Sequence, residues 1–372
     1  ALHVMDEATT ALAAKVPRCQ QGCPIHTNIP EVIRLLKANK LDEAGRMLFE
    51  NNPLDDGLPL VCNHENQCEG HCVRGIKGRA GALLGHRELH LVPPTPAKMT
   101  QGPRAVQRQK NAAIIGSGPA GLTIAVILAR YGYDVTIFES HDKIGGVLRY
   151  GIPEFRLAKT VLDDFEYRHL RLKGIKVRPN TDVGKALNED LFRDGYKAIF
   201  IGTGVWRPNT LHIKGESLGN VHYAINYLQN PDVYHLGNRV IVIGAGNAAM
   251  DVARTAIRHG TRHLECFSLS SHITASEYEA SYAKLEGVNF IFNKKPLEIT
   301  DKGVVFIDLN EAEDGTLTEI PGHRKALPGG IVSLCPSARG PCTTITDSTK
   351  NLKTTPRGLF EADEVGRTSI PG

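Results

Sequence analysis

The sequence has few aromatic residues and no long apolar run. Phe, Trp and Tyr make up 6% of its 372 residues, and there is a single tryptophan. No stretch approaches the ~18 consecutive apolar residues that a transmembrane helix needs, so we expect no membrane span. The net charge is only +4, with Lys and Arg scattered along the chain. A protein that tracks nucleic acid would carry a basic stripe, so we expect no nucleic-acid partner.

The chain also lacks a recognisable secretory signal. Its first residues, ALHVMDEATTALAAKV, have no basic start followed by an unbroken apolar core. Disulfide frameworks form in oxidising compartments, usually in small secreted domains. We therefore expect a cytoplasmic protein with reduced thiols, and the length predicts two to three domains.

Five of the eight cysteines lie in the first fifth of the chain: Cys19, Cys23, Cys62, Cys68 and Cys72. Zinc sites usually contain C-x2-C pairs, which are missing here, and two C-x3-C pairs would leave Cys62 over. A cubane iron–sulfur cluster tolerates irregular spacing, and a proline after a ligand, as after Cys23, is common. The pattern favours iron–sulfur and leaves zinc open.

The character of the sequence changes near residue 110. Residues 1–98 read as short helices joined by Cys-bearing loops, and residues 99–110 complete a linker rich in proline and basic residues. Strand-like and helix-like segments alternate beyond it, which is typical of βαβ units around a parallel sheet. We predict an α/β fold with two such units, the second beginning at NRVIVIGAG.

The first unit contains IIGSGPAGL, a G-x-G-x-x-G motif directly between a strand-like run and a helix. In that context the glycines permit a tight turn, backbone approach to a pyrophosphate, and close packing of helix and strand. Glu139 ends the next strand, where a carboxylate can accept from ribose hydroxyls. The motif predicts dinucleotide binding. The candidate residues are Gly116, Ser117, Gly118, Pro119, Ala120, Gly121, Glu139 and Ser140.

Downstream residues favour FAD as the dinucleotide of this unit. Gly145 and Gly146 offer a second close approach, suited to a flat isoalloxazine and its ribityl chain. Thr203 and Gly204 stand at a later strand end, and Arg149 is a further candidate contact. A domain that bound only NAD would not need these positions. Turns with incidental glycines are the alternative interpretation.

The second unit repeats the turn as G-x-G-x-x-A in VIGAGNAAM. Its candidate nucleotide-binding residues are Gly244, Gly246, Asn247, Ala248 and Ala249. Two such sites in one chain suggest two dinucleotides face to face, an arrangement that serves hydride transfer from a nicotinamide to a flavin. That step needs no side chain as acid or base, so no catalytic residue is predicted. An empty, degenerate unit is the alternative.

Serines follow the next strand of the second unit, at positions 268, 270 and 271. Paired arginines that would clamp a 2′-phosphate are missing there, so NADH is favoured over NADPH. A flavin disulfide reductase would need C-x-x-C or C-x4-C, and neither occurs. We interpret Cys266, Cys335 and Cys342 as buried apolar residues.

Five segments, in order, carry a family resemblance: CQQGCPIHTNIPEVI, CNHENQCEGHC, IIGSGPAGL, GGVLRYGIPEFRL and VIGAGNAAMDVARTA. The chain resembles the small (β) subunit of glutamate synthase and two relatives: the large subunit of bifurcating NADH-dependent ferredoxin:NADP oxidoreductase, and the N-terminal half of dihydropyrimidine dehydrogenase. The resemblance implies a helical iron–sulfur domain over 1–98 and an FAD domain over 111–205 and 326–372. An NAD(P)H domain over 206–325 would be inserted in the latter.

The resemblance also implies metal ligands. One complete set is Cys23, Cys62, Cys68 and Glu88. A second set would include Cys19 and Cys72, but its other two cysteines fall on Ala11 and Ala14. One [4Fe–4S] cluster is therefore expected, and the second would be missing, altered or completed by another chain.

Two further segments depart from the family. GLFEADEVGRTSIPG matches the part just before the final VFAxGD motif, and LPGGIVSLCPSARGP differs from VIxAIGQxP. We expect an FAD site that is cut short or completed elsewhere. The resemblance implies a subunit that passes electrons from NADH through FAD and a cluster to a partner. That partner would be a glutamine-handling subunit, ferredoxin or another complex subunit. A non-catalytic scaffold with decayed cofactor sites is the alternative.

Overall fold

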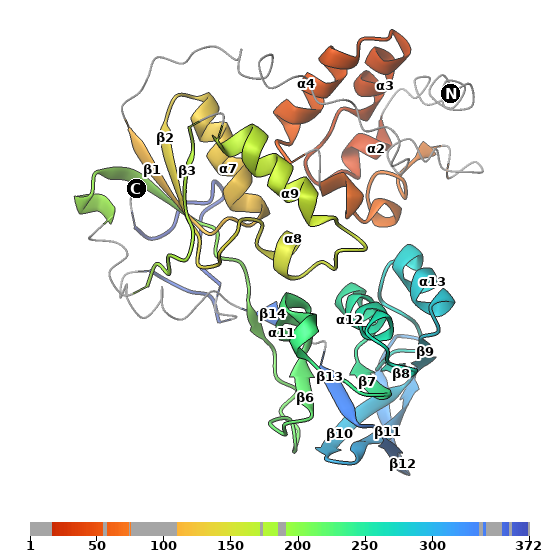
Figure 1. Cartoon of the computed structure of the whole chain (residues 1–372). Coiled ribbons are helices and arrows are strands. Elements are labelled where there is room, and N and C mark those ends of the chain that lie inside the picture. Colours follow the sequence, from red (N-terminus) through yellow and green to blue (C-terminus); the bar gives the residue numbers. More distant parts are fainter. Residues whose placement is uncertain are drawn as a thin grey trace.

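The computed structural model describes residues 17–54, 58–73, 75, 110–171, 174–184, 191–334, 338–339, 352–356 and 359–370. Three units succeed one another along the chain (Figure 1). A helical unit comes first, and two βαβ units come after it. The predicted α/β class is confirmed.

The N-terminal unit consists of short helices and turns. They are α2 (Arg18–Gln21), α3 (Ile29–Lys37), α4 (Leu41–Asn51), η1 (Leu58–Leu60) and η2 (His64–Asn66). Asn28 caps α3 by accepting from the Glu31 backbone N–H at 3.4 Å. Phe49 and Leu54 are buried in the same apolar cluster as Ile114 of the first sheet. The helical unit thus shares a core with the first βαβ unit.

The first βαβ unit has a four-stranded parallel sheet in the order β3-β2-β1-β4. The strands are β1 (Asn111–Ile115), β2 (Asp134–Phe138), β3 (Lys176–Arg178) and β4 (Tyr196–Ile201). The helices are α7 (Pro119–Arg130), α8 (Val147–Tyr150) and α9 (Lys159–Phe165), with a π turn at Glu166–Leu170. Ile114, Leu122 and Ile137 are fully buried between sheet and helices, as the apolar runs of a parallel sheet predict.

The second βαβ unit has a five-stranded parallel sheet in the order β6-β13-β7-β8-β9. Its strands are β6 (Val221–Tyr223), β7 (Arg239–Ile243), β8 (His263–Phe267), β9 (Asn289–Ile291) and β13 (Ile331–Leu334). Its helices are α11 (Ala224–Gln229), α12 (Asn247–Arg258) and α13 (Glu277–Leu285). An antiparallel sheet of β10 (Lys294–Thr300), β11 (Gly303–Glu311) and β12 (Leu317–Pro328) packs on it through the Phe267–Phe306 ring stack.

The chain returns to the first unit after the second. Leu352, Phe360 and Ile370 pack with Ala113 and Ile115 of β1. A short pair, β5 (Arg207–Pro208) with β14 (Ala338–Arg339), joins the two crossings between the units. The second unit is therefore inserted in the first, as expected.

One predicted domain boundary needs correction. The limit between residues 325 and 326 falls inside β12, and β13 pairs in parallel with β6 and β7. The second unit therefore extends at least through Leu334. The apolar strand 331–334 completes the second sheet before the chain returns, which the sequence pattern alone did not reveal. The other domain limits stay predictions.

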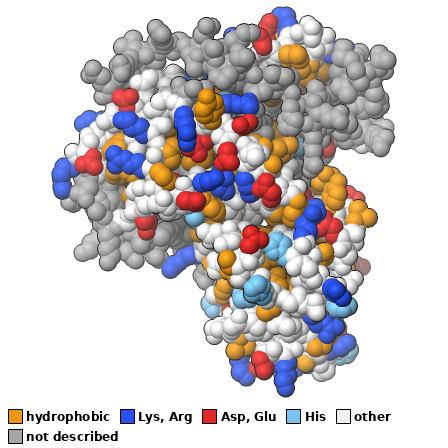
Figure 2. All heavy atoms as spheres, in the orientation of Figure 1, with side chains coloured by type: hydrophobic (Ala, Val, Ile, Leu, Met, Phe, Trp, Pro, Cys, Tyr) orange, Lys and Arg blue, Asp and Glu red, His pale blue; other side chains and the backbone are white. Residues whose placement is uncertain are grey.

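On the coloured part of the face drawn in Figure 2, Lys and Arg lie among Asp and Glu. This mixture agrees with the small net charge of +4. Among the described helices, none has the length and apolar composition needed to cross a membrane.

Candidate dinucleotide and iron–sulfur sites

Each βαβ unit forms the predicted glycine turn between a strand and a helix. Gly116 has a φ of +91° and Gly244 a φ of +136°, a region that glycine enters without strain. The helices after these turns, α7 and α12, each have 12 residues, and no described side chain caps either N-terminus. Their first backbone N–H groups are therefore available to an anion.

Protein packing does not require the middle glycine of either turn. A Cβ on Gly118 would meet no described atom within 4 Å, and one on Gly246 only Thr274 Oγ1 at 3.8 Å. Gly118 has a φ of −69° and a ψ of −179°, which any residue can adopt. A glycine at these two positions fits a bound pyrophosphate, which needs the backbone to come close.

The third position of the motif differs between the units. A Cβ on Gly121 would lie 2.0 Å from the Gly116 carbonyl oxygen. The second unit has Ala249 there, fully buried and with its methyl group accommodated. The α7 turn is thus packed more tightly than the α12 turn.

Glu139 comes directly after β2 and is buried beside the first turn. Its Oε2 accepts from the Ser117 backbone N–H at 2.9 Å and from the Ser117 hydroxyl, and its Oε1 accepts from the His141 N–H at 2.8 Å. Ser140 Oγ also donates to Oε1, at 3.2 Å. Burial raises the pKa of Glu139, but the hydrogen bonds from Ser117 and His141 outweigh it, so the net pKa is lowered. The carboxylate is therefore charged at neutral pH.

The second glycine pair lies against the first turn. The Gly145 N–H donates to the Ser117 carbonyl oxygen at 3.0 Å. Gly146 has a φ of +52°, and a Cβ there would lie 2.8 Å from the Gly118 Cα. The structure thus brings the two glycine segments, 28 residues apart, to one place. Sequence spacing could not give this contact.

Two other predicted contacts lie around the same turn. The end of β4 approaches it, since a Cβ on Gly116 would meet the Thr203 Cα at 3.2 Å. Gly204 comes next, with a φ of +73°. Arg149 donates from Nε to the Ile144 carbonyl oxygen and from Nη2 to Asp163, both at 2.6 Å. Arg149 thus braces the glycine loop, and its contact with FAD stays a prediction.

His141 was missed by the sequence analysis. Its ring stacks on Tyr150 at 4.3 Å, and its Nε2 lies 2.9 Å from Gln229 Nε2 of α11. It therefore connects the Glu139 carboxylate to the second unit. Its position two residues after the predicted acid was the available signal.

At the end of β8 in the second unit, serine hydroxyls follow the strand, whereas Glu139 follows β2 in the first unit. Ser268 and Ser270 lie 3.0 Å apart through their Oγ atoms, and both donate to the His272 carbonyl oxygen. The Ser271 N–H donates to Glu311 Oε2 at 2.6 Å. A hydrogen bond from Ser271 lowers the pKa of Glu311, which places a negative charge at this end of β8.

The N-terminal thiols lie close enough for their charges to affect one another's pKa. Burial, with the charges of Glu69, Cys23 and Cys62 adding to it, raises the pKa of Cys68 to about 12. Burial and then Cys23 raise the pKa of Cys62. These three thiols are the ones that the family resemblance assigns to one cluster.

Cys19 lies near both Cys72 and Cys23. Burial raises the pKa of Cys19, and the charges of Cys72 and Cys23 add to it. Cys23 differs: its hydrogen bonds with the Thr27 side chain and with nearby backbone outweigh its burial and lower its pKa.

The N-terminal thiols do not come together as a set of metal ligands in the described part of the chain. No three His, Cys, Asp or Glu side chains in the described part of the chain lie close enough to hold a metal ion. Glu88, Ala11 and Ala14 lie outside the described residues, as do Cys335 and Cys342. The ligand assignments therefore stay predictions. Cys266 is fully buried in the core of the second unit, which confirms its interpretation as an apolar residue.

Comparisons with known proteins cover both parts of the chain. A family profile for pyridine nucleotide-disulphide oxidoreductases matches residues 110–372. Another, described as dihydropyrimidine dehydrogenase domain II, 4Fe-4S cluster, matches residues 1–87. The oxidoreductase AegA of Escherichia coli is 33% identical over 308 residues, covering 77% of this chain and 46% of AegA. The glutamate synthase [NADPH] small chain of Halomonas elongata is 30% identical, covering 85% of this chain and 72% of that one.

Among solved structures, 2-naphthoyl-CoA reductase has a TM-score of 0.58 at 18% identity, covering 82% of this chain and 43% of that chain. At this identity the likeness concerns the fold alone. The chain spans about half of the length of AegA and about seven tenths of the glutamate synthase chain. These matches confirm the resemblance to the glutamate synthase small subunit and its relatives. The chain belongs to the pyridine nucleotide-disulphide oxidoreductase family.

Proposed function

We propose that this chain passes electrons between NADH and a partner subunit through FAD and one [4Fe–4S] cluster. The observation that carries the proposal is the pair of glycine turns, each leading into an uncapped 12-residue helix. FAD would occupy the first, held by Gly116, Gly118, Glu139 and Gly146, and NADH the second. When bound, FAD supplies the chemistry that accepts a hydride and releases electrons one at a time.

The residues around each turn have different tasks. In the first unit the Glu139 carboxylate would accept from the ribose hydroxyls of FAD, while the N-terminus of α7 would face its pyrophosphate. In the second unit the N-terminus of α12 would face the pyrophosphate of NADH. The protein contributes binding and orientation, and none of its side chains needs to move a proton for hydride transfer.

The preference for NADH rests on the charges near the end of β8. Lys294 donates its backbone N–H to the Ser268 carbonyl oxygen, but its ammonium group pairs with Asp308. Glu311 adds a negative charge beside Ser271. A 2′-phosphate would therefore meet a carboxylate and a neutralised lysine. The glutamate synthase relatives are named for NADPH, which is the contrary indication.

The partner is proposed by analogy with the named relatives. Glutamate synthase small chains are subunits by name, so a glutamine-handling subunit is one candidate partner, and ferredoxin is another. The cytoplasm is the proposed location, because a cluster held by thiolates needs reduced cysteines. A non-catalytic scaffold is the competing function, and the ligand positions Ala11 and Ala14 favour it.

Cofactor analysis separates these functions. Anaerobically purified chain should be yellow and carry about one FAD, with about four iron and four sulfide per chain from a single cubane. A folded but colourless protein would support the scaffold instead. Two intact cubanes per isolated chain would contradict the inference from the two alanines.

Ligand variants sharpen the cluster assignment. Glu88→Ala should loosen the cluster or shift its potential, because an anionic oxygen ligand is replaced by water or an open site. Cys72→Ser should have a much smaller effect, since Cys72 belongs to the incomplete set. Iron analysis and EPR of both variants measure the difference, and equal loss in both would overturn the assignment.

A further inference from the structure

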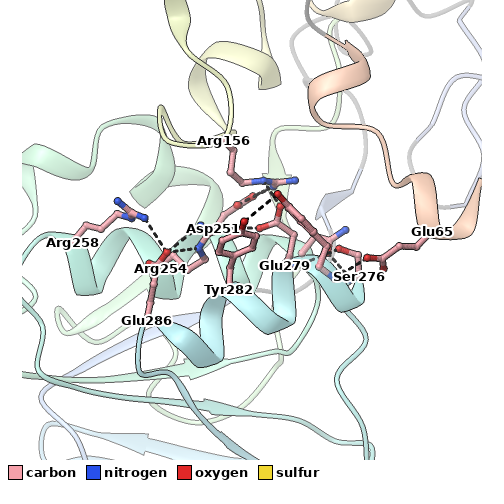
Figure 3. Close-up of polar contacts among 11 residues, drawn as sticks. Glu65, Arg156, Asp251, Arg254, Arg258, Ser276, Glu279, Tyr282 and Glu286 are labelled. Carbon is pink, nitrogen blue, oxygen red and sulfur yellow. Dashed lines mark hydrogen bonds and ion pairs between the residues drawn. The ribbon is translucent and has the colours of Figure 1, made fainter. Parts of the chain in front are cut away.

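A buried charge cluster joins the two βαβ units (Figure 3). Arg156, in the loop between α8 and α9 of the first unit, reaches across to the second. Its Nη1 donates to both carboxylate oxygens of Asp251 on α12, at 2.9 and 2.8 Å. Its Nε pairs with Glu279 Oε1 of α13 at 2.9 Å. One guanidinium thus holds two helices of the other unit.

The cluster is balanced and closed to solvent. Arg254 of α12 pairs with Glu279 at 2.7 Å and with Glu286 at 3.1 Å. The side chains of Arg156, Asp251, Glu279 and Arg254 are between 7% and 14% exposed. Phe155, next to Arg156, covers the cluster, with the Arg254 guanidinium 4.5 Å from its ring centre.

The N-terminal unit contacts the same helix pair from another side. Glu65 lies on η2, between Cys62 and Cys68, and accepts from the Glu277 and Tyr278 backbone N–H groups at 2.8 and 2.9 Å. It therefore caps the N-terminus of α13. The helix that Arg156 holds is thus also attached to the cysteine-bearing loop (Figure 3).

These contacts lie between the two candidate dinucleotide sites. Asp251 is on α12, the helix that begins at the second glycine turn. Arg156 belongs to the segment that continues from Gly145 and Gly146, which lie against the first turn. The Arg156–Asp251 pair therefore connects the segment beside one turn to the helix of the other.

We infer that Arg156 is a positioning residue: by holding Asp251 and Glu279, it fixes the nicotinamide of a dinucleotide on α12 at hydride-transfer distance from the flavin. The inference rests on the proposed function. Hydride transfer needs reacting atoms about 3–3.5 Å apart, and a displacement of about 1 Å can cost about 100-fold in rate. A planar guanidinium that binds two carboxylates on different helices fixes their relative positions, whereas a buried ion pair adds little net stability over apolar packing.

The test uses FAD-loaded Arg156→Met, Arg156→Lys and Asp251→Asn. Arg168→Met is the control because, among the described residues, Arg168 pairs with the exposed Asp164. Arg156→Met should keep FAD and bind NADH within about threefold of wild type, while single-turnover flavin reduction slows about 10- to 100-fold. Arg156→Lys should recover part of the rate. The Arg156→Met/Asp251→Asn double variant should be no slower than Arg156→Met.

A pH profile adds a readout that a merely structural role would not move. Burial, ahead of the opposing charge of Arg156, raises the pKa of Asp251 to about 6. The other charged groups that face it are Glu279 of α13, Arg254 of α12 and Lys159 of α9. The wild-type reduction rate should fall below about pH 6 as the carboxylate is protonated and loses its charge, and Asp251→Asn should lack this fall.

Hydrogen exchange measures the same contact without turnover. Backbone amides of α12 and of residues 151–158 should exchange faster in Arg156→Met than in wild type. In Arg168→Met their exchange rates should equal those of wild type. Wild-type reduction rates in Arg156→Met and Arg156→Lys would overturn the inference. If Arg156→Met does not fold, Arg156→Lys and Asp251→Asn decide it by the same rates. Wild-type protein that holds FAD but is reduced by neither NADH nor NADPH would instead overturn the proposed function, and the inference with it.

Discussion

The two βαβ units begin with the same turn but differ in the residues at the end of the neighbouring strand. In both, a glycine with positive φ precedes an uncapped 12-residue helix. In the first unit a buried carboxylate, Glu139, is hydrogen-bonded to the turn itself. In the second unit the equivalent strand end carries Ser268 and Ser270, and the charge of Glu311 stands at its edge.

The difference between the two units fits a different role for each glycine turn. The first turn is enclosed by the segment at Gly145–Gly146 and by the end of β4, as suits a cofactor that stays bound. The second turn is bordered instead by the segment after β8, where the Thr274 and Ala275 N–H groups donate to the Ala245 carbonyl oxygen at 3.1 and 2.8 Å. Four changes test this comparison.

The largest effect is expected at the third motif position. Gly121→Ala would force a carbon to within 2.0 Å of a backbone oxygen, and should destabilise the protein by about 3 kcal/mol, at the upper end for overpacking. The opposite change in the second unit, Ala249→Gly, should cost only about 1 kcal/mol from helix propensity. Thermal unfolding of both variants measures the contrast, and equal losses would contradict it.

The middle glycines should separate the two dinucleotides. The valine side chain of Gly118→Val would meet no described protein atom at its Cβ, so the fold should persist. It would obstruct the pyrophosphate, so the amount of FAD bound per chain should fall at least about tenfold. Gly246→Val should keep FAD but lose reduction by NADH. Flavin content and stopped-flow reduction are the measurements. Stoichiometric FAD in Gly118→Val would show that the site is misplaced.

Removing the charge of Glu139 should weaken FAD binding less severely. In Glu139→Gln, the buried donors of Ser117 and His141 would face a weaker, uncharged acceptor. We expect this to cost about 1–3 kcal/mol of FAD affinity. Because hydrogen bonds lower the folded-state pKa of Glu139, its contribution to stability is present above the unfolded pKa of about 4.3 and is lost as pH falls through the lowered value. FAD titrations and acid unfolding check both. A stability difference between wild type and variant that peaks at low pH would contradict the sign.

The smallest effect is expected at the edge of the second unit. Wild-type protein should be reduced with a higher kcat/KM by NADH than by NADPH, and Glu311→Gln should narrow that ratio by a few-fold, since one exposed repulsive charge is removed. Glu319→Gln, on the neighbouring strand and paired with Lys295, is the control. A clear NADPH preference in wild type would reverse the proposal.

Local sequence patterns predicted much of the fold and of the two turns. Strand, glycine turn and helix are contiguous in sequence, so spacing alone located Gly116–Gly121 and Gly244–Ala249. The assignment of the cysteines to iron–sulfur clusters came from resemblance to a family. The part of the second sheet formed by β13 was missed, because its strand partners are remote in sequence.

Contacts between units could not be read from the sequence. Arg156 and Asp251 are 95 positions apart, and Glu65 is 213 positions from Tyr278. Each residue alone is an ordinary surface charge. Only packing of α12 and α13 between the other units buries these charges and makes their pairing specific.

The central claim is that the two turns hold two dinucleotides between which a hydride passes. The direct measurement is anaerobic single-turnover reduction of the FAD-loaded chain by NADH and by NADH with deuterium at the transferred position of C4. The account predicts bleaching of the flavin band, slower with the deuterated nucleotide. Absence of bleaching with NADH and NADPH in a chain that holds both FAD and nucleotide would contradict it.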